Sequence, residues 1–515
     1  MSAGVSPRVN APASIRGLCH RAGPARRRLR VPSERRRRVS LRAAALTLAL
    51  ILTLALTLTL AGCTSFIPAY ERPAAPVAGA YPPELLPAGA AGPAAADIDW
   101  QRYFADPRLR ALIELALVNN RDLRIAVLNI EQARAAYGVR RADALPSVGA
   151  GVSASRQPGA AGGLANAFAV GVQVTGYELD FFGRVRSLSE AALAQYLATA
   201  EARKTAQIAL IGAVANTHIG LVADDELLRV TRDTLQTREE SLRLTKLKFD
   251  AGATSELDHR QAEQLYEAAR ATLAQTQRQR ALGQNALVLL IGQPLPADLP
   301  AALPLTAQQV TAELPAGLPS DLLERRPDLR AAEQRLRGAD ANIGAARAAF
   351  FPRIALTANA GTASTALSGL FKGGSFAVTG TASLLQPIFD AGRNRANLDV
   401  ARVNRELAVA QYEQAVQTAF REVADALAGR ATLGEQLRAT AAQANAAQVT
   451  YRLADLRYRN GASSFLEVLD AQRAVFAAQQ GTVQVQAAQI QNLVTLYKVL
   501  GGGWAEPATA ARATP

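Results

Sequence analysis

Residues that could carry chemistry are sparse in this chain of 515 residues. Of its three histidines, only His218 and His259 lie beyond the N-terminal leader, and neither has another His, a Cys or paired carboxylates at the spacing of a zinc site. Neighbouring carboxylates such as Glu239 and Glu240 have no companion base. The chain also lacks a Walker-type phosphate loop and a Gly-x-Ser-x-Gly nucleophile motif. We therefore expect no enzymatic activity, no metal and no dissociable cofactor.

One cysteine has a context that favours covalent modification. Cys63 follows Leu60, Ala61 and Gly62 at the end of an apolar run, residues 43–62. This ending resembles a bacterial lipobox, in which the thiol is acylated and the cysteine becomes the new N-terminus. A permanent transmembrane helix is the alternative, because about 20 apolar residues can span a bilayer. We expect a signal peptide over 1–62 and a lipid on Cys63. Thr64 in place of Asp favours the outer membrane, by resemblance to lipoprotein sorting.

The net charge of +14 first suggests nucleic acid or an anionic membrane as a partner. Residues 1–62 hold 12 Arg and one Glu, so the remainder has 45 basic and 42 acidic residues and is nearly neutral. The basic excess therefore belongs to the leader, and we expect no nucleic-acid partner. The 42 residues before the apolar run are long for a signal peptide, and Val31 or Val39 could be the true start.

Two segments of the chain are duplicated. Residues 120–124 match 326–330, and residues 249–253 match 458–462, the second pair at an offset of 209. Such internal repeats indicate two copies of one structural unit. We place the first repeat at 97–298, a linker at 299–317 and the second repeat at 318–503. Residues 63–96, rich in Pro, Ala and Gly, predict an extended tether to the lipid, and 504–515 a disordered tail.

Each half has the same expected order of elements. A helix of about 35 residues is followed by two strand-like segments, a long helix without proline, a glycine turn and a returning helix. The expected helices are 107–143, 184–249 and 255–291 in the first half and 320–350, 393–459 and 464–500 in the second. At 1.5 Å per residue, each long helix would extend about 100 Å. A structural coiled-coil protein would have the same helices.

The strand-like segments are the feature that bears on whether this is a structural coiled-coil protein or a membrane protein. Phe168, Val170 and Val172 alternate with small or polar residues, as do Ile354 and Leu356 in the second half, which indicates strands with one apolar face. Four strands cannot close a membrane barrel, because the smallest such barrels need eight. If the strands lie in a membrane, several chains must therefore pool them. A soluble four-stranded sheet covered by the helices satisfies the alternation equally well.

The combined pattern resembles the TolC-type outer-membrane efflux channels over essentially all of 97–503. The resemblance rests on the lipobox, the duplicated order of helices and hairpins, and two short motifs. These are Trp100-x-x-Phe104-x-Asp106-Pro107 and the segment from Tyr458 through Ala471. The lipidated form is similar to the NodT-type outer-membrane lipoproteins that serve resistance–nodulation–division pumps.

The resemblance implies a mainly α fold with membrane β structure. Three copies would form one twelve-stranded outer-membrane β-barrel, continued by a long periplasmic α-helical barrel. The homotrimer would sit in outer-membrane lipid, and a periplasmic adaptor protein and an inner-membrane RND-type pump would dock at its tip.

The resemblance also implies a periplasmic gate at the hairpin turns. Asp470 matches the constricting acidic position, with Glu467 and Tyr458 beside it, and Asp258 lies at the corresponding turn of the first half. Three carboxylates meeting on an axis would bind cations and narrow the pore. Ser463 stands where some relatives carry Arg, so an Asp–Arg latch is not assumed. The alternative for each charge is a solvated coiled-coil face.

Three functions remain open on the sequence. The first is a channel exporting drugs or other small toxic compounds, the second a type I protein-secretion conduit of the same fold, and the third a structural coiled-coil lipoprotein. The lipobox favours the first by resemblance. The cargo cannot be predicted, because the partner pump would select it.

Overall fold

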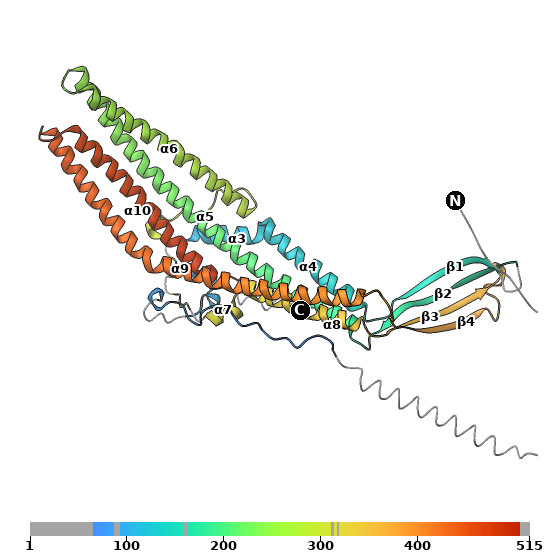
Figure 1. The fold of residues 1–515 in the computed structure, drawn as a ribbon. Helices are drawn as coiled ribbons and strands as arrows, with labels where there is room; N and C mark the ends of the chain where they lie inside the picture. Colours follow the sequence, from blue (N-terminus) through green and yellow to red (C-terminus); the bar gives the residue numbers. More distant parts are fainter. Residues whose placement is uncertain are drawn as a thin grey trace, which may run out of the picture. The chain divides into compact units, whose positions relative to one another are not determined.

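The computed structural model describes residues 65–86, 93–158, 163–308, 310, 314–316 and 319–504, without the side chains of 319 and 320. The expected signal peptide, Cys63 and the tail after Trp504 lie outside the described residues. Within the unit that begins at Cys63, a β-sheet lies at one end of the helices and two helical hairpin tips lie at the other (Figure 1).

The long helices agree with the sequence prediction to within a residue or two at each end. They are α5 (Arg184–Asp250), α6 (Glu256–Ile291), α9 (Arg393–Arg459) and α10 (Phe465–Val499). Each 67-residue helix begins after a glycine in the left-handed region, Gly183 or Gly392, and ends two residues before a second, Gly252 or Gly461. Only glycine enters that region without strain, so these positions fix where the chain turns.

The first helix of each half is broken, which corrects the expectation of continuous helices over 107–143 and 320–350. The first half has α3 (Pro107–Asn119) and α4 (Arg121–Ala142), and the second has α7 (Pro319–Arg325) and α8 (Pro327–Ala348). Asn120 is extended and caps α4, its side-chain oxygen accepting from the Leu123 amide. In the second half Pro327 disfavours helical geometry at the preceding Arg326.

Apolar side chains from both halves meet in one core around the middle of the helices. The short helix α2 (Trp100–Tyr103) contributes Tyr103, which stacks on Tyr497 at 4.0 Å between ring centroids. The Tyr103 hydroxyl donates to the Leu493 carbonyl, and the Tyr497 hydroxyl donates to the Ile98 carbonyl. Among the described helices, α5 has an 18-residue stretch apolar enough to cross a membrane, but 61% of that stretch is buried within the protein. The stretch therefore serves as core.

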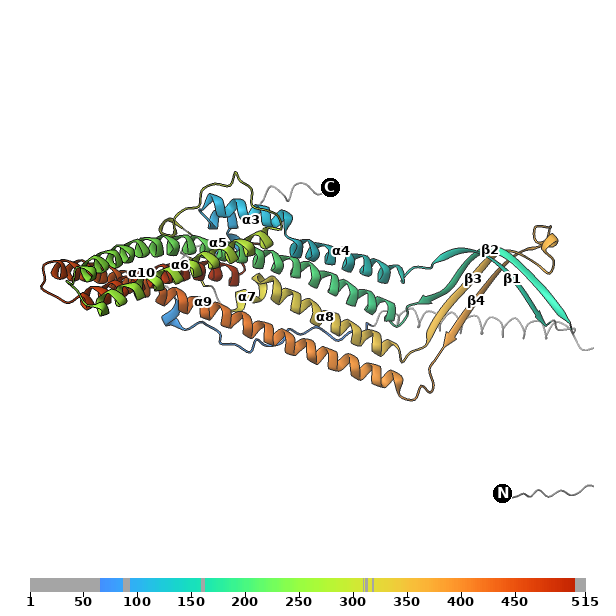
Figure 2. The same cartoon turned by 90° about the horizontal axis from the view of Figure 1, so that it is seen from above.

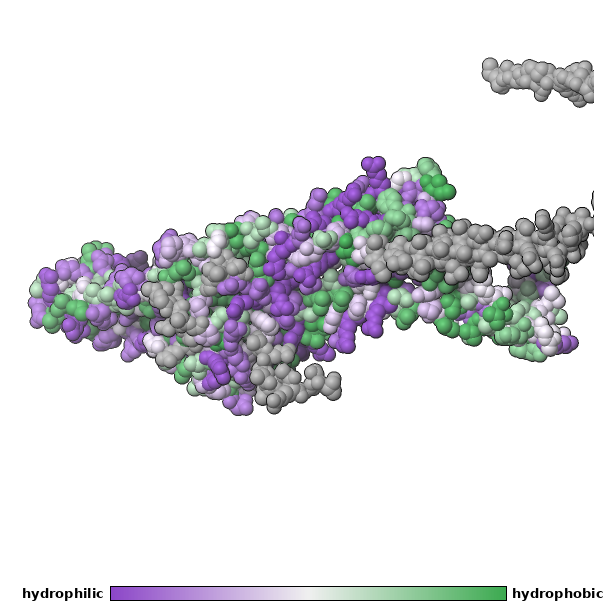
Figure 3. Space-filling model, turned by 90° about the horizontal axis from the view of Figure 1, so that it is seen from below, coloured by the Kyte–Doolittle hydropathy of each residue, from purple (hydrophilic) through white to green (hydrophobic). Residues whose placement is uncertain are grey.

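The strands form one antiparallel sheet in the order β1-β2-β3-β4. They are β1 (Val148–Pro158), β2 (Leu164–Leu179), β3 (Arg353–Ser364) and β4 (Phe376–Leu385). The two halves join at β2 and β3, where Gly171 lies opposite Gly361 and the backbones approach closely. This leaves β1 and β4 as the edges of the sheet. Many apolar strand side chains are exposed, and apolar colouring covers much of the sheet surface (Figure 3).

Residues 65–82, which precede the first helical turn, are extended, and they pack along helices of the second half (Figure 2). Tyr70 and Arg72 both donate to the Glu333 carboxylate of α8 at 3.0 Å. Helix α8 in turn contacts both α5 and α9. Gly344 of α8 leaves space for Ile67, since a Cβ there would lie 2.5 Å from the Ile67 side chain. The segment is thus held against the helices by specific contacts.

Candidate functional site at the helical tips

Asp258, the predicted site residue at the first hairpin turn between α5 and α6, forms hydrogen bonds within that turn. Ser255 caps α6 by accepting from the Asp258 amide, and Thr254 Oγ1 donates to Asp258 Oδ2 at 2.7 Å. Among the described residues, no hydrogen bond or ion pair links Asp258 to Glu467, Tyr458 or Asp470. The Asp258 carboxylate therefore stabilises its own turn, which is the role of an acidic residue in the first turn of a helix.

The second turn, between α9 and α10, holds the other charged candidates at its surface. Glu467 lies in the first turn of α10, with its Oε2 3.8 Å from Nη1 of Arg457 on α9. Asp470, one turn further along, is 62% exposed, and its Oδ1 accepts from Arg473 Nη1 at 2.8 Å. This partner was not predicted. Since the pair is exposed and local, it contributes little to stability and leaves the carboxylate accessible.

Tyr458 is the predicted residue that joins the two hairpins. Its hydroxyl accepts from Lys248 Nζ of α5 at 3.1 Å, and the same Nζ lies 4.3 Å from the centre of the Tyr458 ring. Phe465 of α10 packs against the ring at 5.2 Å. Lys248 was absent from the sequence prediction. The repeat offset of 209 aligns it with Arg457, the basic residue beside Glu467, and that alignment is the signal that could have found it.

A small apolar cluster holds these side chains in place. Phe465, Val468 and Leu469 of α10 pack with residues of α6 and α9, and all three are buried. Between α5 and the α9–α10 hairpin, a cavity of about 520 Å³ is lined by Lys248 and Tyr458 together with further residues of all three helices. Apolar and polar positions therefore alternate with helical spacing around α10, and Glu467 and Asp470 are directed outward.

The two histidines in the described part of the chain, His218 and His259, make contacts that stabilise the fold. His218 Nε2 lies 2.9 Å from Asp106 Oδ2, and both side chains are buried. Burial alone would raise the pKa of Asp106, but hydrogen bonds from His218, Gln308 and the Arg108 amide hold it below its usual value. Asp106 thereby fixes the start of α3 to α5. His259 stacks on Phe249 at the first tip.

Comparison with known proteins gives consistent matches over both halves. The family described as "Outer membrane efflux protein" matches residues 112–293 and 318–502. The toluene efflux pump outer membrane protein TtgC of Pseudomonas putida is 47% identical over 470 residues, covering 90% of this chain and 97% of that protein. The outer membrane protein OprJ of Pseudomonas aeruginosa is 44% identical and covers 86% and 94%.

Solved structures agree in the same way. The open state of the MtrE outer membrane channel of Neisseria gonorrhoeae matches with a TM-score of 0.79 at 42% identity, over 86% of this chain and 99% of that one. The CmeC outer membrane channel of Campylobacter jejuni matches with a TM-score of 0.79 at 26% identity, over 87% and 97%. The matches thus include the sheet, the long hairpins and their tips.

Proposed function

This chain belongs to the outer membrane efflux protein family, and from that premise we propose that three copies form one conduit of a tripartite efflux system. Family membership makes the chain an outer-membrane channel component of an efflux pump, with its helices extending into the periplasm. Beyond this, we propose that the channel is a homotrimer and that it binds an adaptor protein and a pump.

The sheet edges are the observation that carries assembly from several copies, and the resemblance to TolC-type channels sets their number at three. The sheet has four strands, and β1 and β4 are its edges. Unpaired backbone groups cannot face lipid, because each would lose its hydrogen bonds to water. Pairing β4 of one copy with β1 of the next closes the edges, and three copies supply twelve strands.

The long hairpins support the periplasmic half of the proposal. Helices α5 and α9, each about 100 Å long, continue from the sheet toward the tips. An adaptor protein and an inner-membrane pump of the resistance–nodulation–division type would dock there. The energy for export would come from that pump, and the conduit itself would need no catalytic residue or cofactor.

The names of the relatives support a small-molecule cargo. Similar proteins of Pseudomonas putida are named as components of toluene, solvent and antibiotic efflux pumps. We propose that this channel likewise passes small toxic organic compounds. This favours the efflux function over a type I protein-secretion conduit.

A lipid on Cys63 belongs to the same proposal. The apolar run and the small residues before Cys63 support cleavage at that position and acylation of its thiol. An intact-mass measurement of membrane-purified protein tests this. The expected species begins at Cys63 and carries added acyl mass, whereas an unprocessed or unacylated chain would contradict the assignment.

We place the periplasmic gate at Asp470. Three copies of an exposed carboxylate near one axis would attract and retain cations. Arg473 partly neutralises each carboxylate, and the Lys248–Tyr458 contact links the α5 hairpin to the one that carries Asp470. Glu467 and Asp258 would hold the geometry of the two turns.

Single-channel recording in planar bilayers tests the gate. Asp470→Ala should raise the conductance and weaken block by divalent cations, whereas Arg473→Gln should strengthen that block. Glu435→Gln, which removes an exposed carboxylate paired with Arg438 away from the tip, is the matched control. Equal conductance and equal block in wild type and Asp470→Ala would remove Asp470 from the gate.

A further inference from the structure

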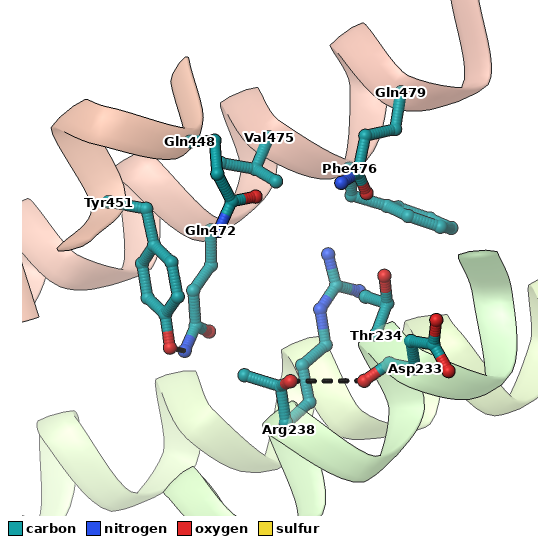
Figure 4. A pocket seen from close by; sticks show the side chains of 10 residues that line it. Asp233, Thr234, Arg238, Gln448, Tyr451, Gln472, Val475, Phe476 and Gln479 are labelled. Atoms are coloured by element: carbon teal, nitrogen blue, oxygen red, sulfur yellow. Dashed lines mark hydrogen bonds between the residues drawn. The ribbon is translucent and has the colours of Figure 1, made fainter. Parts of the chain in front are cut away.

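A second polar cavity lies between the hairpins, and its lining residues are further along the helices from the turns than the gate residues are. Figure 4 shows the side chains that line it. It has a volume of about 190 Å³ and is lined by side chains of α5, α9 and α10. Arg238 of α5 points into it, facing Gln472 and Phe476 of α10. None of the gate residues lines this cavity.

Arg238 is a buried cation without a counter-ion among the described residues. Its side chain is only 4% exposed, Nη1 donates to the Leu265 carbonyl at 3.0 Å, and Nε has no hydrogen-bond partner. Asp233, the only carboxylate among the described residues that line the cavity, is exposed and pairs with Arg229. Burial lowers the pKa of Arg238, as does repulsion by Arg473. A buried and unpaired charge is strongly unfavourable, so the site is incomplete as it stands.

Gln472 presents a second unsatisfied group to the same cavity. It is 5% exposed, and its Nε2 donates to Ser241 Oγ at 3.1 Å and to the Tyr451 hydroxyl at 3.5 Å. Its Oε1 has no hydrogen-bond partner in the part of the chain that the structure describes. Both hydroxyls can donate as well as accept, so rotation of the amide would keep both bonds and place the NH₂ group at the unpartnered position. The cavity would then hold two sets of free donors.

We infer that this cavity binds a small organic carboxylate, with its oxygens on Arg238 and Gln472 and its hydrocarbon part against Phe476. The planar guanidinium, whose Nη1 bonds to the Leu265 carbonyl and whose Nε is unpartnered among the described residues, matches the planar geometry of a carboxylate. The Phe476 ring faces the guanidinium, with its centre 5.0 Å from Arg238 Cζ, and together with Val475 it gives the cavity an apolar wall. A cavity of about 150 Å³ is known to hold benzene, so a one-ring acid fits in this volume.

Ligand-observed fluorine NMR on the detergent-purified full protein tests the inference, with 4-fluorobenzoate as the probe and sodium chloride held constant. Line broadening should give a Kd at least about tenfold lower for wild type than for Arg238→Gln, since one charge-assisted pair is removed. Arg243→Gln is the matched control, because Arg243 is exposed and pairs with Glu240 on the same helix. The neutral analogue 4-fluorobenzyl alcohol should not discriminate wild type from Arg238→Gln.

A second variant keeps the test decisive if Arg238→Gln folds poorly. Gln472→Glu places a carboxylate on the same cavity wall, where it can pair with Arg238. It should raise the melting temperature and abolish binding of 4-fluorobenzoate. Equal broadening in wild type, Arg238→Gln and Gln472→Glu would overturn the inference. It would also be overturned if wild type bound the acid and the alcohol equally, because the charge would then have no role.

Discussion

At the residue scale, Tyr458 and Lys248 differ from the other charged and polar residues of the tips. Asp258, Glu467 and Asp470 contact residues of their own hairpin, whereas the Lys248–Tyr458 contact joins α5 to the second hairpin. A contact between two elements can hold one relative arrangement of them, which a contact within one hairpin cannot do. This pair is therefore the residue-scale candidate for holding the tip closed.

Graded substitution of this pair should open the channel in two steps. Tyr458→Phe removes the hydrogen bond but keeps the ring, and Lys248→Met removes both the bond and the cation–π contact. Each contact is worth about 1 kcal/mol, so open probability in planar bilayers should rise in Tyr458→Phe and further in Lys248→Met. Lys246→Gln is the control, because Lys246 pairs with Asp250 on its own helix. Unchanged gating in Lys248→Met would show that the contact does not restrain the tip.

The buried Asp106 predicts a specific dependence of stability on pH. Its pKa is held below that of an unfolded aspartate, so its contribution is complete above about pH 4 and is lost as the pH falls further. Asp106→Asn should lower stability by about 2 kcal/mol at pH 7, because His218 and Gln308 lose their anionic partner. Calorimetry at several pH values should show the deficit shrinking below pH 4. A deficit that is constant with pH would contradict the ionic role.

The sequence located the gate candidates but could not predict their contacts. Asp470, Glu467 and Tyr458 follow from the resemblance and lie at the second tip. Lys248 and Arg473 were missed because their partners depend on the rotation and packing of neighbouring helices, which periodicity alone does not fix. The orphaned groups of Arg238 and Gln472 have the same origin, since each appears only when α5 and α10 pack together.

Among the elements, the strands and long helices could be predicted from the sequence, and Pro327 was a signal for the break in the second half, whereas the break at Asn120 and the pairing order could not be predicted. The alternation of apolar with small or polar residues predicted β2 and β3, and the long stretches without proline predicted α5 and α9. Asn120 breaks the first helix by capping the start of α4, through a hydrogen bond that helical periodicity does not reveal. The pairing of β2 with β3 joins segments from different halves, and a single sequence gives no sign of such a distant contact.

Gly171 and Gly361, which lie opposite each other where β2 pairs with β3, give a testable prediction. A Cβ at Gly361 would lie 2.2 Å from the Val170 carbonyl oxygen, so Gly361→Ala must force the two strands apart. We expect a loss of about 1–3 kcal/mol, measured as a lower melting temperature of the assembled protein. Gly380→Ala is the matched control, because a Cβ there has nothing within 4 Å. Equal melting temperatures for the two variants would show that the close approach does not persist in the assembly.

At the scale of the whole molecule, the two halves together make one third of a proposed barrel. The duplication gives each half one pair of strands, and joining β2 to β3 leaves β1 and β4 as edges that a neighbouring copy covers in the proposed assembly. Such a head-to-tail contact closes into a ring only at a fixed rotation between copies, and otherwise it continues as a filament. Whether the edges close into a ring can therefore be tested by measuring the number of copies in the assembly.

Cysteine cross-linking across those edges tests closure directly. We predict that Val152→Cys on β1, combined in turn with cysteine at successive β4 positions from Ala377 to Gly380, will form disulfides at one register only. Under mild oxidation in outer membranes, the product should reach the mass of three chains and no more, because the ring closes. Each single-cysteine variant controls for reaction with Cys63. Products larger than three chains would indicate open assembly, and the absence of any cross-link along β4 would mean that the two edges do not meet.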